Sequence, residues 1–462
     1  MSESSRYRGR RAVVLGLGLT GLSLARHLAR HGAKVRVADT RSDPPNRAAL
    51  AATLPDIPLA SGEFSDATFD GVDMIAISPG VSQHHPAIRT AVAAGVEIVG
   101  DIELFARALP ADQKVLAVTG TNGKSTVTSL TGALTHAAGL STIVAGNIGH
   151  PVLDALAAIE AGCTWPNAFV LELSSYQLET TTSLRPVAAT VLNVSANHMD
   201  RYAGIADYAA AKARIFTHAN VQVINRDDPI VRLMRLPGRT VQTFGASVPL
   251  SEEEWGLVER ADGTWLARGG ELIMQASRLA LVGRHNVQNS LAALALASSV
   301  TKLGRAMQDA LAAFRGLPHR MAPIAEADDV LYVDDSKGTT VAATQVALEG
   351  IGRPVVLIAG GDGKGQSFAP LRAAVDRTCR AVLLIGRDAP QIERALAGSQ
   401  VRVEMVGTLA LAVERAIDVA LPGDAVLLSP ACASLDQFRD YVERGRRFAE
   451  LVNARLAADV DA

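Results

Sequence analysis

Short, continuous runs of apolar residues alternate along the chain with longer segments rich in alanine and leucine. An apolar run without polar alternation, bounded by helical segments, is typical of a parallel strand that is buried on both faces. The pattern therefore predicts an α/β protein with mostly parallel sheets. The predicted strands cover residues 12–15, 34–38, 74–77, 115–118, 168–173, 189–192, 330–333, 355–359, 381–385 and 425–428.

Breaks in this pattern suggest where domains meet. The first unit ends near Gly100 and Asp101, before a helix and a new strand, and a Gly-Leu-Pro turn at 316–318 ends a helical stretch. The polar segment 247–281 indicates a small β-rich excursion. A length of 462 residues fits three domains of about 150 residues each. We predict a Rossmann-like domain at 1–102, a central P-loop ATPase domain at 103–316 and a Rossmann-like domain at 317–462.

Composition excludes several classes of protein. The net charge is −2, and no long run of Lys and Arg occurs, which argues against nucleic acids or membrane surfaces as partners. Cys163, Cys379 and Cys432 are too sparse for a disulfide framework or a metal cluster, so a reducing compartment fits best. No apolar stretch reaches the roughly 18 residues of a membrane span. We expect a soluble protein of the cytoplasm.

The strongest chemical signal is a glycine-rich loop between a strand and a helix. Its glycines let backbone N–H groups surround a phosphate, Lys124 can reach the β and γ oxygens, and the Ser125 hydroxyl can ligate Mg²⁺. The spacer is shorter than in the standard P-loop. A glycine-rich turn with a solvated lysine is the alternative, and the combination of strand, loop and helix makes it the weaker interpretation. The loop consists of Gly120, Thr121, Asn122, Gly123, Lys124, Ser125 and Thr126.

Two residues after neighbouring strands are candidate partners of this loop. Glu172 ends an apolar strand, as the acidic Mg²⁺ residue of P-loop enzymes does, although many strands end in an acid without function. His198 follows the strand 189–192. A single histidine is more often structural, but its place after a strand of the predicted ATPase domain also allows a functional role.

Lys212 lies on what should be the buried side of a helix. Tyr208, Ala211, Lys212, Ile215 and Phe216 have the spacing of one apolar stripe. A buried ammonium is costly unless it is paired or modified. Either the side chain extends to water, or its charge has been removed or inverted.

A second glycine-rich loop lies near the N-terminus. Gly16, Gly18 and Gly21 form a G-x-G-x-x-G pattern, and Asp39 ends the next strand 18 residues after Gly21. Alone, this pattern would suggest NAD. The physical argument supports only a diphosphate at a helix N-terminus with an acid near the nucleoside, and a uridine diphosphate would also satisfy it.

Three loops in the last third follow predicted strands and carry unusual polar motifs. They read DDSKGTT from position 334, GGDGKG from position 360 and SPACAS from position 429. Lys337 and Lys364, together with several hydroxyls, suggest a site for an anion such as a dicarboxylate.

These motifs resemble those of the Mur ligase family, and most closely its D-glutamate-adding branch. The resemblance runs from Gly16 to about Phe448 and rests on GLGLTG, GTNGKST, LELSSYQLE, NHMDRY, YAAAKARIF, GRHNVQN, GLPHR, DDSKGTT, GGDGKG and SPACASLDQF. It implies an ATP-dependent amide ligase of peptidoglycan precursor synthesis, which joins D-glutamate to UDP-N-acetylmuramoyl-L-alanine through an acyl phosphate. The implied partners are small molecules, the implied cofactor is Mg²⁺, with two ions expected, and we expect a monomer.

The resemblance also implies a role for individual residues. The uridine substrate would contact Leu19, Thr20, Asp39, Thr40, Arg41, Gly80, Asn147, Ser174 and Gln177. ATP would contact residues 120–126 with Asn286, Asn289, Arg320 and Asp335. The metal would be bound by Ser125, Glu172, His198 and a carbamate on Lys212. The catalytic residues would be Lys124, His198 and Lys212. D-glutamate would contact Lys337, Thr339, Lys364, Ser434, Leu435 and Tyr441.

Three positions depart from the family's pattern. Asn197 stands where an acid often precedes the histidine, Thr340 where Asn is common, and Tyr441 where a Phe can line the amino-acid pocket. They bear on specificity rather than on the reaction. Other functions remain open: another amide ligase of this family, a nicotinamide-dependent oxidoreductase that uses the N-terminal glycine-rich loop, or a P-loop switch protein without ligase chemistry.

Overall fold

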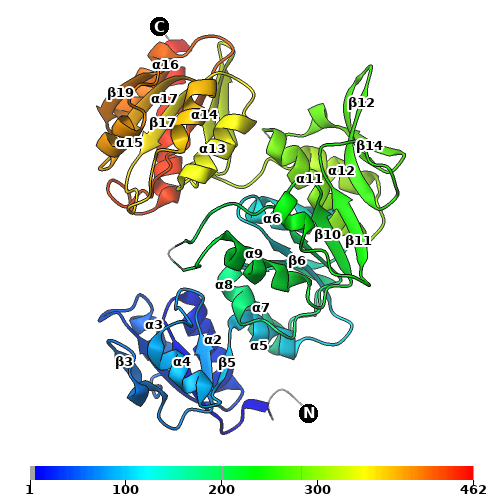
Figure 1. Cartoon of the computed structure of the whole chain (residues 1–462), viewed down its shortest axis with the longest axis vertical. Coiled ribbons are helices and arrows are strands. Elements are labelled where there is room, and N and C mark those ends of the chain that lie inside the picture. Colours follow the sequence, from blue (N-terminus) through cyan, green and yellow to red (C-terminus); the bar gives the residue numbers. More distant parts are fainter. Residues whose placement is uncertain (1–5, 200, 282, 461–462) are drawn as a thin grey trace. The chain divides into compact units, whose positions relative to one another are not determined.

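The computed structural model describes residues 6–199, 201–281 and 283–460. The chain contains three sheets that follow one another in sequence, drawn in Figure 1 in blue, in cyan to green, and in yellow to red. It divides into two compact units, one made of Met1–Val258, Ala267–Ile273 and Leu291–Ala310, the other of Glu259–Leu266, Met274–Ser290 and Leu311–Ala462. The boundaries of the three predicted domains therefore stay a prediction.

The first sheet is parallel, with the strand order β3-β2-β1-β4-β5. Alternate residues of its central strand pack on opposite faces: Val14 joins the cluster that contains Leu28, and Val13 joins the cluster that contains Ile88. Burial on both faces explains why the strand is continuously apolar. The elements are β1 (Arg11–Leu15), α2 (Leu19–Arg30), β2 (Lys34–Asp39), α3 (Arg47–Thr53), β3 (Leu59–Ser61), β4 (Met74–Ile77), α4 (Pro86–Ala93) and β5 (Glu97–Val99).

The central sheet has nine strands in the order β14-β13-β12-β11-β10-β9-β6-β8-β7. Strand β6, which leads into the predicted phosphate loop, pairs in parallel with β8 on one side and with β9 on the other. The strands are β6 (Lys114–Thr119), β7 (Thr142–Gly146), β8 (Ala168–Glu172), β9 (Ala188–Val191), β10 (Val221–Asn225), β11 (Thr240–Phe244), β12 (Glu254–Arg260), β13 (Gly263–Arg268) and β14 (Glu271–Gln275). The helices are α5 (Asp101–Ala108), α6 (Lys124–Ala137), α7 (Val152–Glu160), α8 (Ser175–Glu179), α9 (Ile205–Ala213), α10 (Pro229–Arg232), α11 (Arg284–Ser298) and α12 (Arg305–Ala313).

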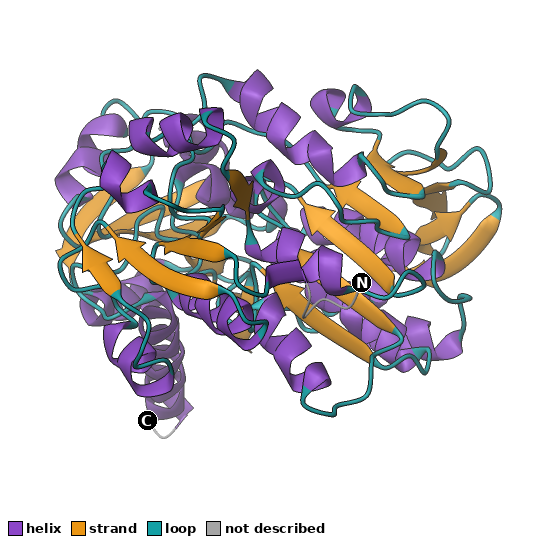
Figure 2. Cartoon of the chain, turned by 90° about the horizontal axis from the view of Figure 1, so that it is seen from below, coloured by secondary structure: helices purple, strands orange, loops and turns teal. Residues whose placement is uncertain are grey.

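The third sheet has the order β15-β16-β20-β17-β18-β19, with β15 antiparallel to β16 and the other pairs parallel. Its central strand is again buried on both faces, since Leu357 and Ile358 belong to different core clusters. Figure 2 shows helices on both faces of the sheets. The elements are β15 (Ala322–Ala327), β16 (Val330–Asp334), α13 (Val341–Gly350), β17 (Val355–Gly360), α14 (Leu371–Thr378), β18 (Cys379–Ile385), α15 (Ala389–Ala395), β19 (Arg402–Gly407), α16 (Leu409–Val419), β20 (Ala425–Leu428) and α17 (Tyr441–Val460).

The predicted strands are all present, with ends that differ by two residues or fewer, and the β-rich excursion at 247–281 contains β12, β13 and β14. The α/β prediction is confirmed. Strands β3, β5, β7, β10, β11, β15 and β19 were not predicted; all of these except β10 and β11 lie at the edge of a sheet. Among the described residues, no helix is long and apolar enough to cross a membrane.

Candidate active site

The N-terminal glycine-rich loop, residues 16–21, opens onto a cavity of about 610 Å³ in the first compact unit. A Cβ at Gly21 would lie 1.8 Å from the carbonyl oxygen of Gly16, so only glycine lets α2 begin this close to the loop. The residues that line the cavity are Gly16, Gly18, Leu19, Thr20, Asp39, Thr40, Arg41, Ser78, Pro79, Gly80, Val81, Gly146, Asn147, Ile148, Gly149, Pro151 and Gln177. They include every residue expected to hold the uridine substrate except Ser174, whose hydroxyl caps α8 by accepting the backbone N–H of Gln177 at 3.2 Å.

The charges in this cavity are paired with one another. Asp39 is 2% exposed, and its carboxylate accepts hydrogen bonds from the Leu17 backbone N–H at 2.6 Å and from Arg41 Nε and Nη2 at 2.8 and 2.6 Å. The bonds from the Arg41 guanidinium lower the pKa of Asp39 to about 2. The pair therefore stays charged at neutral pH.

The glycine-rich loop at 120–126, called the phosphate loop below, is held by a residue that follows the neighbouring strand β9. Gly123 has φ +81° at the N-cap of α6, a conformation that favours glycine. Asn193, which follows β9, accepts the Thr121 N–H on its backbone oxygen at 2.9 Å and the Asn122 N–H on its side-chain oxygen at 2.8 Å. Lys124 Nζ donates to the carbonyl oxygens of Gly120 and Thr121 at 3.0 and 2.9 Å. These bonds hold the backbone of the loop at the N-terminus of α6, the kind of place where proteins bind phosphates.

Lys212 is buried beneath this loop. It is 1% exposed on α9, and its Nζ donates to the Gly120 carbonyl at 2.8 Å and lies 4.5 Å from the centre of the Tyr208 ring. Desolvation, followed by repulsion from Lys124, lowers the pKa of Lys212 well below its usual value. The prediction that this stripe faces the core is confirmed, and the alternative in which the ammonium reaches water is wrong.

Glu172 contacts the cavity expected to hold the uridine substrate, which is called the uridine cavity below, from a strand that neighbours β6. The Asn147 side chain, which lines the cavity, donates to Glu172 Oε1 at 2.8 Å, and the Asn147 backbone N–H donates to the Glu172 carbonyl at 2.8 Å. The other carboxylate oxygen, Oε2, is buried and has no hydrogen-bond partner among the residues that the structure describes. A buried anionic oxygen of this kind fits a divalent cation.

His198 lies in an aromatic cluster beside the phosphate loop. Its ring centroid lies 4.9 Å from that of Tyr176 and 6.1 Å from that of Tyr208, the residue that also contacts Lys212. Its φ is +58°, which is unusual for a residue other than glycine and occurs often at functional sites. The side-chain oxygen of Asn197 accepts the His198 N–H at 2.9 Å, a bond that an aspartate would also make. Asp200 of the same motif lies outside the described residues.

The remaining residues expected at ATP belong to the second compact unit. Asn289 donates to the Asn286 side chain at 2.9 Å, and both are buried on α11. Asp335 accepts the Ser429 hydroxyl at 2.7 Å; burial raises its pKa to about 7, and the positive charge of Arg320 opposes this rise. The structure does not place these residues relative to the phosphate loop.

The three polar loops of the last third lie at one edge of the third sheet, because β16, β20 and β17 are parallel neighbours. Backbone hydrogen bonds join them: Ala431 N–H donates to Gly338 at 2.9 Å, and Ala433 N–H donates to Asp362 at 2.8 Å. Lys337 Nζ lies 4.0 Å from the centre of the Tyr441 ring, while Lys364 is exposed.

The other residues expected at the amino acid differ in exposure. Ser434 is buried and Leu435 is 61% exposed. The Thr339 N–H donates to the Lys337 carbonyl at 2.8 Å. Thr340 caps α13 by accepting the Ala343 N–H at 3.3 Å, which an asparagine could do as well.

Two residues were not predicted as part of the site: Asn193, which holds the phosphate loop, and Arg444, which holds two of the polar loops of the third sheet. Asn193 supports the phosphate loop, as described above. Arg444 is 1% exposed and donates to the backbone oxygens of Ser336 and Cys432 at 2.8 and 3.1 Å, and burial lowers its pKa to about 10. The only sequence signal for Asn193 was its place after a strand, whereas an arginine in a helix usually indicates a solvated face.

The fold and the two glycine-rich loops define a multidomain P-loop enzyme with a second nucleotide-type cavity. Models of known families agree along the chain: the Mur ligase MurD-like N-terminal domain matches residues 10–100, the Mur ligase middle domain 118–297 and the Mur ligase glutamate ligase domain 319–432. The chain belongs to the Mur ligase family.

Full-length relatives agree with this assignment. The UDP-N-acetylmuramoylalanine--D-glutamate ligase of Thiobacillus denitrificans is 53% identical, with 99% of this chain and 98% of the relative covered. The protein of the same name from Chromobacterium violaceum is 51% identical, with coverage of 98% and 99%. The likeness to solved structures concerns the fold alone: UDP-N-acetylmuramate-alanine ligase MurC from Thermotoga maritima has a TM-score of 0.59 at 19% identity, covering 96% of this chain and 99% of that one.

Proposed function

We propose that the chain joins D-glutamate to UDP-N-acetylmuramoyl-L-alanine, with conversion of ATP to ADP and phosphate. The proposal rests on the contacts of Asn147. This residue lines the uridine cavity, and its side chain donates to the carboxylate of Glu172. Glu172 ends β8, which pairs with β6, the strand that leads into the phosphate loop. A substrate in the cavity would thereby end beside the ATP phosphates. We further propose that the chain acts as a monomer in the cytoplasm, where its three free cysteines would stay reduced.

The proposed chemistry has two steps. A carboxylate oxygen of the uridine substrate attacks the γ-phosphorus of ATP, the bond to the β–γ bridging oxygen breaks, and ADP leaves. The amine of D-glutamate then attacks the acyl carbon, loses a proton, and phosphate leaves as the C–O bond breaks. The backbone N–H groups of the loop and Lys124 would hold the phosphates and neutralise their charge, and position matters more here than covalent participation.

Mg²⁺ fits the residues around Glu172. The unpartnered Glu172 Oε2 and the Ser125 hydroxyl, which is buried at the start of α6, would hold the metal, and His198 would stand beside them. When bound, Mg²⁺ would supply positive charge at the phosphate oxygens. His198 would also help to close the site through its contacts with Tyr176 and Tyr208.

We propose that Lys212 carries a carbamate in the active enzyme. Its lowered pKa increases the fraction of neutral amine, which is the form that attacks CO₂; the new N–C bond forms and a proton is released. The product is an anion with two oxygens, which suits a hard cation. An unmodified ammonium at this depth would instead repel the metal and Lys124.

D-glutamate would bind at the loops after β16, β17 and β20. Lys337 and Lys364 would face its two carboxylates, with Thr339, Ser434, Leu435 and Tyr441 around them. What supports this site is the meeting of two cations at one sheet edge.

Phosphate release tests the proposed function. The purified chain would be given ATP, Mg²⁺ and a panel of UDP-muramoyl precursors and amino acids. We expect release only with UDP-N-acetylmuramoyl-L-alanine and D-glutamate together. ATP hydrolysis that ignores the amino acid would instead indicate a switch protein, and another successful pair would indicate a different ligase of the family.

A further inference from the structure

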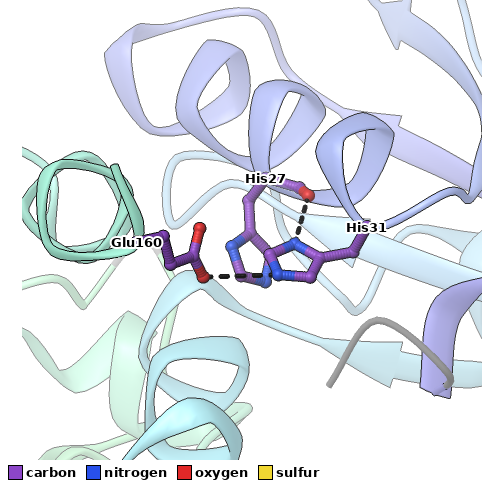
Figure 3. A group of neighbouring side chains, drawn as sticks. All are labelled: His27, His31 and Glu160. Carbon is purple, nitrogen blue, oxygen red and sulfur yellow. Dashed lines mark hydrogen bonds and ion pairs between the residues drawn. The ribbon is translucent and has the colours of Figure 1, made fainter. Parts of the chain in front are cut away.

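Two histidines and a glutamate meet where α2 packs against α7, at the ends of these helices that are remote from the uridine cavity (Figure 3). His27 is in the last turn of α2, His31 follows that helix, and Glu160 is the last residue of α7. His27 is 0% and His31 8% exposed, whereas Glu160 reaches solvent. One ligand atom from each residue lies within 4.8 Å of the others.

The hydrogen bonds of His31 fix which of its nitrogens faces the carboxylate. His31 Nδ1 lies 2.8 Å from the backbone oxygen of His27; this oxygen can only accept, so Nδ1 carries a hydrogen. His31 Nε2 lies 3.3 Å from Glu160 Oε1. With the hydrogen on Nδ1, the Nε2 of a neutral ring is an acceptor that faces a carboxylate oxygen, and a bound cation would bridge these two atoms.

Glu160 is oriented by a second contact. Arg30 Nε donates to Glu160 Oε2 at 2.7 Å, which leaves Oε1 directed at the histidines. A backbone carbonyl that orients one histidine and a guanidinium that orients the carboxylate are outer contacts of the kind that support metal ligands.

We propose that His27, His31 and Glu160 form a binding site for a divalent transition metal of the Zn²⁺ type. Ions of this type bind readily to a set of two imidazoles, here one helical turn apart, and a carboxylate, whereas Mg²⁺ prefers oxygen ligands alone. Ligands about 2.0–2.1 Å from a tetrahedral metal lie roughly 3.3–3.4 Å from one another. The 3.3 Å between His31 and Glu160 already has this spacing, and a ligand atom of His27 lies within 4.8 Å of both.

The metal would tie together two walls of the uridine cavity. Leu19 and Thr20 at the start of α2 line the cavity, and so does Pro151, which immediately precedes α7. His27 and His31 lie about 12 and 18 Å along α2 from Leu19, at 1.5 Å per residue. The Ser23 hydroxyl donates to Asp154 at 2.6 Å, so the two helices are already linked midway. A metal at the far end would make their relative position more rigid.

Zn²⁺ titration of the metal-stripped full chain by calorimetry, without ATP or Mg²⁺, tests the site. We expect one equivalent to bind, and His27→Gln and His31→Gln each to weaken this binding by at least about tenfold. His136→Gln is the matched control, because His136 is exposed in the last turn of α6. It should bind Zn²⁺ like the wild type.

Glu160→Gln changes a surface residue and keeps the shape of the side chain. It should weaken Zn²⁺ binding, shift the visible absorption of bound Co²⁺, and abolish the rise in Tm that Zn²⁺ causes in the wild type. If the His27, His31 and His136 variants bind Zn²⁺ equally, the metal site does not exist. If Zn²⁺ leaves the Tm of the wild type unchanged while Glu160→Gln lowers Tm, then His27, His31 and Glu160 form only an ion pair between two helices. Neither result depends on ligase activity.

Discussion

The loop before α2 and the loop before α6 both follow a parallel strand, both contain glycines at the turn, and both open a helix. They differ in how the nearby charges are neutralised. Beside the first loop, Asp39 and Arg41 neutralise each other through two side-chain hydrogen bonds. Beside the second, Lys124 and Lys212 donate to backbone carbonyls, and Glu172 keeps a buried oxygen without a partner among the described residues.

The same backbone geometry therefore supports two kinds of site. Where the charges are already paired, a bound diphosphate meets backbone N–H groups and a fixed surface, which suits recognition. Beside the second loop, Lys124 and Lys212 donate to backbone carbonyls, and a nucleotide and a metal would bring further charges, which suits a reaction in which charge moves between phosphate groups. Substitutions on the two sides should thus have different kinetic effects.

The largest effect should come from Lys124→Ala. We expect turnover to fall by about 10³-fold, because the charge on the phosphates loses its nearest cation. Binding of the uridine substrate, measured by calorimetry, should change less than about twofold. Lys114→Ala is the control, because Lys114 lies at the exposed start of β6, the strand that leads into the phosphate loop. This variant should behave like the wild type. Near-normal turnover in Lys124→Ala would remove ATP from this loop.

Lys212→Ala should come next, with a loss of about 10²-fold or more in kcat. Acetate in the assay should restore part of the activity by supplying a carboxylate where the carbamate stood. Lys212→Arg should be inactive and should not respond to acetate, because the guanidinium occupies the space with the wrong charge. Steady-state kinetics with and without acetate measure this. A crystal structure at neutral pH that shows an unmodified, solvent-directed Lys212 in a fully active preparation would contradict the carbamate.

Lys337→Ala and Lys364→Ala should act on a single substrate. Each removes a cation that would face a carboxylate of D-glutamate in the proposed site, so KM for D-glutamate should rise about tenfold, equivalent to roughly 1.4 kcal/mol. KM for ATP should stay within about twofold. Lys302→Ala, at an exposed position, serves as the control. Equal increases in both KM values would move the amino-acid site away from these loops.

Asp39→Asn should have the smallest effect, visible in stability. The pKa of Asp39 is lowered to about 2 when folded, below its unfolded value, so its contribution is present above about pH 4 and is lost as the pH falls toward 2. The wild type should lose about 2 kcal/mol of unfolding free energy across this window that the variant does not lose. Denaturant unfolding at several pH values measures the difference, and Asp43→Asn is the exposed control. Parallel pH profiles of wild type and Asp39→Asn would show that the Arg41 pair contributes nothing.

Much of the fold follows from local pattern. Central strands such as β1 and β17 are apolar on both faces, and the stripe containing Lys212 has the period of a helix, so both could be predicted. Most of the missed strands are edge strands, and the strands were predicted from continuous apolar runs; β19, for example, alternates polar and apolar residues instead.

The site divides in the same way. The glycine-rich loops lie within one stretch of sequence and are visible there. The bond from Asn147 to Glu172 depends on β7 and β8 being neighbours, and the burial of Arg444 depends on which loops α17 covers. His27 and Glu160 are 133 residues apart, and only the packing of α2 on α7 brings them together.

The account rests on transfer of the γ-phosphoryl group of ATP to the carboxylate of the uridine substrate. Labelling that carboxylate with ¹⁸O and analysing the released phosphate by mass spectrometry tests this step directly. The account predicts that each phosphate carries one labelled oxygen, because the C–O bond of the acyl phosphate breaks when the amine attacks. Phosphate without label, released together with the amide product, would contradict it.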